Sequence, residues 1–182
     1  MKPKPAVRNK PKLVVRKYTG TSDGIGVGER KGLTVLIKYL SEQTDGALWN
    51  NGSFGVRNMR GKESLSVHAT GRAVDLSFRK MEKKGKPNGR KYALRAMEFL
   101  VTHANALGLE MIIDYWPAPY GRAWRCDRNA WQNYDKKTVS GAPSGDWFHV
   151  EISPEMANAP EKMKEVLAGL MYPQPDDFGQ AS

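Results

Sequence analysis

Two short motifs, about seventy residues apart, place the strongest constraint on how this chain folds. Residues 66–75 read Ser-Val-His-Ala-Thr-Gly-Arg-Ala-Val-Asp, and residues 146–149 read Asp-Trp-Phe-His. Together they contain two histidines and two aspartates, which are residue types that bind zinc in hydrolases through nitrogen and oxygen atoms. A fold that uses this pattern must bring the two motifs side by side.

His68, Asp75 and His149 are the candidate metal ligands. A catalytic zinc ion takes three protein ligands and keeps a fourth position open. Asp146 is then left over, three residues before His149, where its carboxylate could take a proton from the attacking water as a general base. A lone histidine beside a strand is more often structural, so the prediction depends on the two motifs together.

The spacing also predicts how the first motif presents its ligands. If Thr70 and Gly71 form a tight turn, His68 and Asp75 lie on paired strands and point to the same face. Gly71 suits a turn position that needs a positive φ. Ser66 falls on this face too, where its hydroxyl would bond a metal ligand or a substrate carboxylate, or would face solvent as an ordinary strand serine.

The second motif is predicted to lie where a turn meets a strand. Residues 143–146 have the composition of a turn, and residues 147–152 have that of a strand. His149 and Glu151 then share one face of the strand, because side chains alternate. Asp146 lies an odd number of positions from His149, so it must sit in the turn to reach the metal site.

The remaining apolar pattern predicts an α+β domain. Helical spacing of apolar residues occurs around residues 33–40, 93–107 and 160–170, and a strand is expected at residues 109–116. We therefore expect a small, mainly antiparallel sheet that carries the zinc ligands and is flanked by about three helices.

The pattern Ser-x-His-x-x-Gly-x-Ala-x-Asp, with a later Asp-x-x-His, resembles the zinc peptidases that include D-Ala-D-Ala carboxypeptidases and the L-alanyl-D-glutamate endopeptidases of phage endolysins. The resemblance spans roughly residues 30–152. It implies a Hedgehog/DD-peptidase-like fold, one zinc ion per chain, and the stem peptides of bacterial peptidoglycan as substrate. It also implies that Arg57 binds substrate, either by orienting a substrate carboxylate or by stabilising the oxyanion. Aspartate at position 146 looks like the endopeptidases, whereas carboxypeptidase relatives tend to carry glutamate there.

The net charge of +10 is concentrated at the N-terminus, because residues 1–17 hold seven basic residues and no acidic one. The prolines and dispersed charges of this segment predict an extended tail. We expect residues 1–28 to form a flexible tail and linker, residues 29–172 the peptidase domain, and residues 173–182 a C-terminal tail. The basic tail would attract anionic cell-wall polymers, act as a nucleic-acid arm, or only keep the chain soluble. The first suits the catalytic motifs better, and no specific nucleic-acid partner is expected.

No apolar run approaches the length of a membrane span, and the N-terminus lacks the apolar stretch of a secretory signal. If the chain is phage-encoded, the resemblance implies that it stays in the host cytoplasm until it is released to act at the cell wall. Two alternatives to an enzyme are a cell-wall binding module with the same fold and a basic nucleic-acid binder. The intact ligand set argues against the first, and only the tail supports the second.

Overall fold

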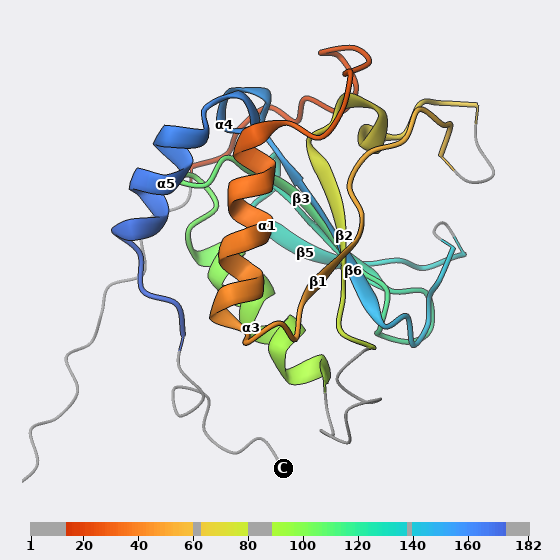
Figure 1. The fold of residues 1–182 in the computed structure, drawn as a ribbon. Helices are drawn as coiled ribbons and strands as arrows, with labels where there is room; N and C mark the ends of the chain where they lie inside the picture. Colours follow the sequence, from red (N-terminus) through yellow and green to blue (C-terminus); the bar gives the residue numbers. More distant parts are fainter. Residues whose placement is uncertain (1–13, 60–62, 80–88, 138–139, 174–182) are drawn as a thin grey trace, which may run out of the picture.

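The computed structural model describes residues 14–59, 63–79, 89–137 and 140–173. Within these ranges the chain has an α+β fold with a six-stranded antiparallel sheet and four α-helices (Figure 1). The expected α+β class with an antiparallel sheet is therefore confirmed, and the described residues form four helices where about three were expected. The basic residues before position 14 and the C-terminal tail after position 173 lie outside the described residues.

The sheet has the strand order β1-β2-β6-β3-β4-β5. Its strands are β1 (Trp49–Gly52), β2 (Ala73–Ser77), β3 (Leu109–Asp114), β4 (Arg122–Arg125), β5 (Ala130–Asn133) and β6 (Trp147–Ile152). The helices are α1 (Lys31–Gln43), α3 (Gly89–Thr102), α4 (Pro154–Asn158) and α5 (Pro160–Ala168), and a short 3-10 helix, η1 (Val67–Thr70), precedes β2. The two strands that carry the motifs, β2 and β6, are thus neighbours inside the sheet.

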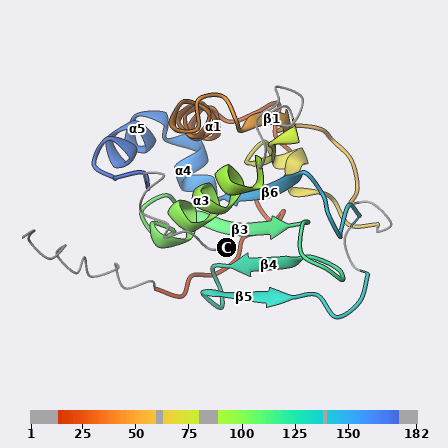
Figure 2. The same ribbon diagram turned by 90° about the horizontal axis from the view of Figure 1, so that it is seen from below.

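The helices lie against one face of the sheet, and the apolar core fills the space between the two layers (Figure 2). Alternate side chains of the motif strands point into this core: Val74 and Leu76 from β2, and Phe148, Val150 and Ile152 from β6. The intervening side chains of β2 and β6 face the opposite side of the sheet. Asp75 of β2 and His149 of β6 are among these side chains.

The periodic elements occur where they were expected, but their ends differ by several residues. The helix expected over residues 93–107 ends at Thr102, and Gly108, with a φ of 63°, precedes β3. Sequence periodicity did not predict β1, β4, β5 and α4, because elements of four or five residues carry little periodic signal. No helix among the described residues combines the length and the apolar character that crossing a membrane requires.

The expectation of a strand before Gly71 is wrong, because that segment forms the 3-10 helix η1. Ser66 caps this helix by accepting a hydrogen bond from the backbone N–H of His68 at 3.4 Å. The hydroxyl of Thr70 donates to the carbonyl of Val67 at 2.9 Å. Such local bonds from side chain to backbone compete with strand pairing. Gly71 has a φ of 77°, so the expected positive φ is confirmed.

Residues 16–23, which we call the N-terminal strap, are hydrogen-bonded to the domain although composition placed them in a flexible tail and linker. The backbone N–H of Arg16 donates to the carbonyl of Cys126 at 3.0 Å. Asp23 accepts from the guanidinium groups of Arg30 at 2.6 Å and of the fully buried Arg72 at 3.2 Å. Polar and charged contacts hold the strap in place, and a search for apolar periodicity does not detect them.

Gly71→Ala should destabilise the fold far more than Gly46→Ala. Both glycines have a positive φ, 77° and 72°, so both alanines suffer a left-handed backbone strain of roughly 1 kcal/mol. Only at Gly71 would the new Cβ lie 1.9 Å from a backbone oxygen, that of Gly28, whereas nothing lies within 4 Å at Gly46. Urea denaturation should show a loss of about 3 kcal/mol or more for Gly71→Ala. Equal losses in the two variants would contradict this close approach.

Candidate metal centre

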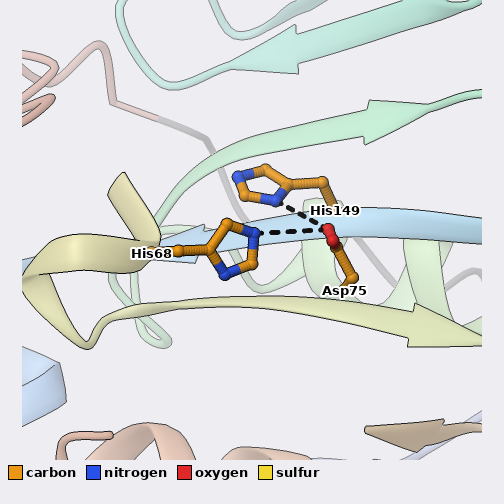
Figure 3. Close-up of side chains that lie close together, drawn as sticks. All are labelled: His68, Asp75 and His149. Atoms are coloured by element: carbon orange, nitrogen blue, oxygen red, sulfur yellow. Dashed lines mark hydrogen bonds and ion pairs between the residues drawn. The ribbon is translucent and has the colours of Figure 1, made fainter. Parts of the chain in front are cut away.

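His68, Asp75 and His149 converge on the side of the sheet that the helices leave open (Figure 3). His68 comes from η1, Asp75 from β2 and His149 from β6. Each side chain offers one ligand atom, and these three atoms lie within 4.8 Å of one another. The structure therefore brings together the three residues that the sequence predicted as metal ligands.

The pairing of β2 with β6 places two of these ligands. Asp75 lies directly opposite His149 in this antiparallel pair, and Ala73 lies opposite Glu151. Opposite residues have Cβ atoms about 4.5–5.5 Å apart, so a carboxylate and an imidazole ring on one face meet without distortion. Oδ1 of Asp75 is 2.9 Å from Nδ1 of His149.

The short helix η1 brings the third ligand to the same carboxylate. Nε2 of His68 lies 3.5 Å from Oδ1 of Asp75, and the ring centroids of His68 and His149 are 4.8 Å apart. Both histidines are buried, whereas the Asp75 side chain is 19% exposed. The carboxylate is thus the least buried of the three candidate ligands.

The donor set fits a divalent metal ion. Two imidazole nitrogens and a carboxylate oxygen are ligands of catalytic zinc sites that keep one position open. Tetrahedral zinc with bonds of about 2 Å separates its ligand atoms by roughly 3.3 Å. The distances from Asp75 to the two rings, 2.9 and 3.5 Å, lie on either side of that value. The same ligands suit other divalent transition metals, so the geometry defines a metal centre and not one particular ion.

A further carboxylate, that of Glu151, holds the other side of the His149 ring. Oε1 of Glu151 is 2.9 Å from Nε2 of His149, and the carboxylate is buried. Metal-binding histidines usually donate their second ring N–H to such a group, which fixes the tautomer and the ring orientation. Strand alternation had placed Glu151 on the same face as His149. The contact between them depends on side-chain conformations, which the sequence does not reveal.

The charges of these groups are coupled. Burial alone would lower the pKa of His149, but hydrogen bonds to Asp75 and Glu151 outweigh burial and raise this pKa to about 10. Burial would raise the pKa of both carboxyl groups, yet their bonds to the histidines hold the pKa of Asp75 and that of Glu151 below the usual range. His149 in the metal-free protein is therefore a cation between two carboxylates.

Asp146, the predicted general base, lies in the turn before β6, as expected. Its backbone carbonyl accepts hydrogen bonds from the N–H of Phe78 and the hydroxyl of Ser77, both at 3.0 Å. Its side chain is 31% exposed, and Oδ1 lies 4.0 Å from the guanidinium group of Arg79. Asp146 is not part of the group of converging ligand atoms. Its position thus agrees with a role other than that of a metal ligand.

Tyr115 was not among the predicted site residues, but it lies beside this turn. Its ring centroid is 5.1 Å from that of Trp147, and its carbonyl accepts from the N–H of Gly145 at 3.3 Å. Burial raises the pKa of Tyr115, and the negative charge of Asp75 raises it further, so the phenol keeps its proton. The signal that could have found it is its place directly after β3, the strand that pairs with β6.

Arg57 and Ser66, the predicted substrate-binding residues, lie close together beside the first motif. The N–H of Ser66 donates to the carbonyl of Arg57 at 3.0 Å. The Arg57 side chain is exposed, and its positive charge opposes the rise in the pKa of Tyr115. The hydroxyl of Ser66 caps η1, so it has a structural role in addition to the predicted one.

No protein-family model, curated protein or solved structure matches this chain. The fold and the site themselves define its class, which is an α+β protein with a buried His-Asp-His group able to hold a metal ion. This class is the basis for a functional proposal.

One divalent ion should bind per chain, and the affinity should fall on acidification. The ion must displace the proton on Nδ1 of His149, so binding releases a proton at any pH below the raised pKa of about 10. Calorimetric titration with zinc in buffers of different ionisation enthalpy measures both the affinity and this release. His68→Ala and Asp75→Ala should each weaken binding. His103→Gln is the control, because the ring of His103 packs against Phe99 outside the centre. An equal loss there, or binding without proton release, would contradict the assignment.

Proposed function

We propose that this chain is a zinc-dependent peptidase that hydrolyses stem-peptide bonds of bacterial peptidoglycan, as the L-alanyl-D-glutamate endopeptidases of phage endolysins do. The convergence of His68, Asp75 and His149 is the observation that carries the proposal. The motif resemblance supplies the substrate class. A zinc ion held by these residues would polarise the scissile carbonyl and lower the pKa of the attacking water.

Asp146 has the role of general base in this mechanism. It takes the proton from the attacking water and returns a proton to the leaving amine. The bonds from Ser77 and Phe78 to its backbone hold the turn in place. Arg79 faces its carboxylate and is itself bonded to Asn51 at 2.5 Å. The turn that carries the carboxylate is therefore fixed to the end of β2, and the side chain is partly exposed.

Arg57 and Ser66 have the role of binding the substrate. The planar guanidinium fork of Arg57 matches a carboxylate in two-pronged geometry, and stem peptides carry free carboxylates near their scissile bonds. Ser66 adjoins it and would donate its hydroxyl proton to the same group. The basic residues before position 14, which lie outside the described residues, would add a longer-range attraction to anionic cell-wall polymers.

Digestion of purified peptidoglycan, followed by mass spectrometry of the new chain ends, tests this function. New C-terminal L-alanine and N-terminal D-glutamate are the expected products. Released D-alanine would instead indicate a D-Ala-D-Ala carboxypeptidase, the alternative within the same class. Binding to peptidoglycan without any new chain ends would indicate a cell-wall binding module and would contradict the proposed activity.

Asp146→Asn should abolish most of the activity while the protein still folds and binds zinc. The amide is nearly isosteric with the carboxylate but accepts no proton, so the rate should fall roughly 100-fold or more. Asp146→Glu should keep partial activity, because glutamate still provides a carboxylate. Asp135→Asn, at an exposed position, is the control and should leave the rate unchanged. Wild-type cleavage rates in the Asp146→Asn variant would remove this residue from the mechanism.

Arg57→Lys should lower turnover with little change in melting temperature. Lysine keeps the positive charge but loses the two-pronged geometry. The exposed side chain of Arg57 contributes little to packing, so the fold should tolerate the change. Arg57→Gln, which removes the charge as well, should lower the peptidoglycan cleavage rate further. A large drop in melting temperature for Arg57→Lys would instead assign the residue to a structural contact.

A further inference from the structure

The N-terminal strap reaches the metal centre through one side chain. The hydroxyl of Tyr18 donates a hydrogen bond to Oε2 of Glu151 at 2.7 Å. The other oxygen of that carboxylate, Oε1, is 2.9 Å from Nε2 of His149. Nδ1 of the same ring is 2.9 Å from Asp75. A continuous chain of hydrogen bonds therefore runs from the strap, which lies outside both motifs, to two of the three candidate ligands.

The direction of each bond in this chain follows from the chemistry of the groups. An ionised carboxylate only accepts hydrogen bonds, so the phenol must donate to Oε2 and the imidazole must donate its Nε2–H to Oε1. With Nε2 engaged as a donor, the nitrogen of His149 that can bind an ion is Nδ1, which faces Asp75. Because Tyr18 holds one oxygen of Glu151, the carboxylate plane and hence the direction of its other oxygen are defined.

Two further contacts attach this part of the strap to the domain. The guanidinium carbon of Arg125 lies 4.7 Å from the centre of the Tyr18 ring. The next residue, Thr19, donates its hydroxyl to Glu110, a buried carboxylate that also accepts from Arg72 at 2.9 Å. The Arg125 contact is thus made by the Tyr18 ring itself, whereas the Thr19 bond attaches the neighbouring part of the strap to β3.

We propose that the N-terminal strap is a working part of the metal centre, in which Tyr18 acts through Glu151 as a positioning residue that orients His149 and raises the affinity for the metal ion. The proposal rests on the metal centre of the proposed function but not on peptidase activity. Outer groups that hold a metal-binding histidine typically change metal affinity when they are replaced.

If the role of Tyr18 were only structural, its hydrogen bond would hold the strap on the sheet without affecting metal binding. Thr19 distinguishes the two roles, because it is a strap residue whose hydroxyl also bonds a buried carboxylate, that of Glu110. In the described part of the chain, this carboxylate bonds Thr19 and Arg72 and neither ligand histidine. Tyr18→Phe and Thr19→Val each remove one hydroxyl from the strap. Only the first should alter the binding of metal.

The test is a double-mutant cycle on metal affinity. Dissociation constants for zinc are measured by chelator competition for the full chain and for the variants Tyr18→Phe, Glu151→Gln and their combination. Glu151→Gln should weaken binding roughly 10- to 100-fold, and Tyr18→Phe, one bond further out, about three- to tenfold. Tyr18→Phe should have no further effect in the Glu151→Gln background, because the group through which it acts has been replaced. Thr19→Val should bind zinc as the unsubstituted chain does.

Melting temperatures of the metal-free variants show whether each one folds, and nitrogen NMR of the His149 ring reports which nitrogen carries the proton in the zinc-bound state. An unchanged affinity in Tyr18→Phe, or the same loss in both backgrounds, would overturn the proposal. So would an equal loss in Thr19→Val. A chain that binds no zinc would overturn both this proposal and the metal centre. A chain that binds zinc and shows the expected cycle, but cleaves no peptidoglycan, would contradict only the peptidase function.

Discussion

The antiparallel pairing of β2 with β6 is the interaction on which the candidate centre depends, because it sets Asp75 opposite His149. A slip of one residue would turn every side chain of β2 to the other face and replace Asp75 by an apolar neighbour. The buried side chains of Val74 and Leu76 oppose that slip, since it would expose them. Packing on the helix-covered face therefore fixes the geometry of the metal face.

The centre concentrates negative charge in a place that water reaches poorly. Asp75 and Glu151 flank the His149 ring, and Glu151 is buried. Buried charges are stable only when they are paired, so the ring keeps a proton in the metal-free protein. A divalent ion offers the same compensation and binds more groups at once. The negative charge that keeps His149 protonated without metal is thus the same charge that favours a bound divalent ion.

Arg72 gives the first motif a structural role beside its ligands. Its fully buried guanidinium donates to Glu110 at 2.9 Å, to the carbonyl of Ile152 at 2.7 Å, and to Asp23 of the strap at 3.2 Å. These partners lie on β3, at the end of β6 and in the strap. One side chain of the motif therefore joins the segments whose relative positions define the centre. Removal of one partner from such a buried network is costly, because the remaining charges lose their compensation.

The sequence by itself determined the features that depend on local periodicity and residue type. These are the α+β class, the strand of His149 with Glu151 on the same face, the leucine-lined α1, and the identity of the three candidate ligands. Period two and period 3.6 are properties of neighbouring residues, so they can be read without a fold. The function assigned to the centre stays a prediction from the motif and its geometry.

Only the tertiary structure decided the rest. The segment that ends at Thr70 forms the capped 3-10 helix η1 and not a paired strand. The two hydrogen-bonding patterns compete, and the motif alone does not show which one forms. The bond between Tyr18 and Glu151 joins residues 133 positions apart, and no periodic pattern in the sequence encodes a contact between two polar side chains at that distance. Such contacts arise only when the core has packed and brought the strap to the sheet, because their energy depends on burial and on the positions of both partners.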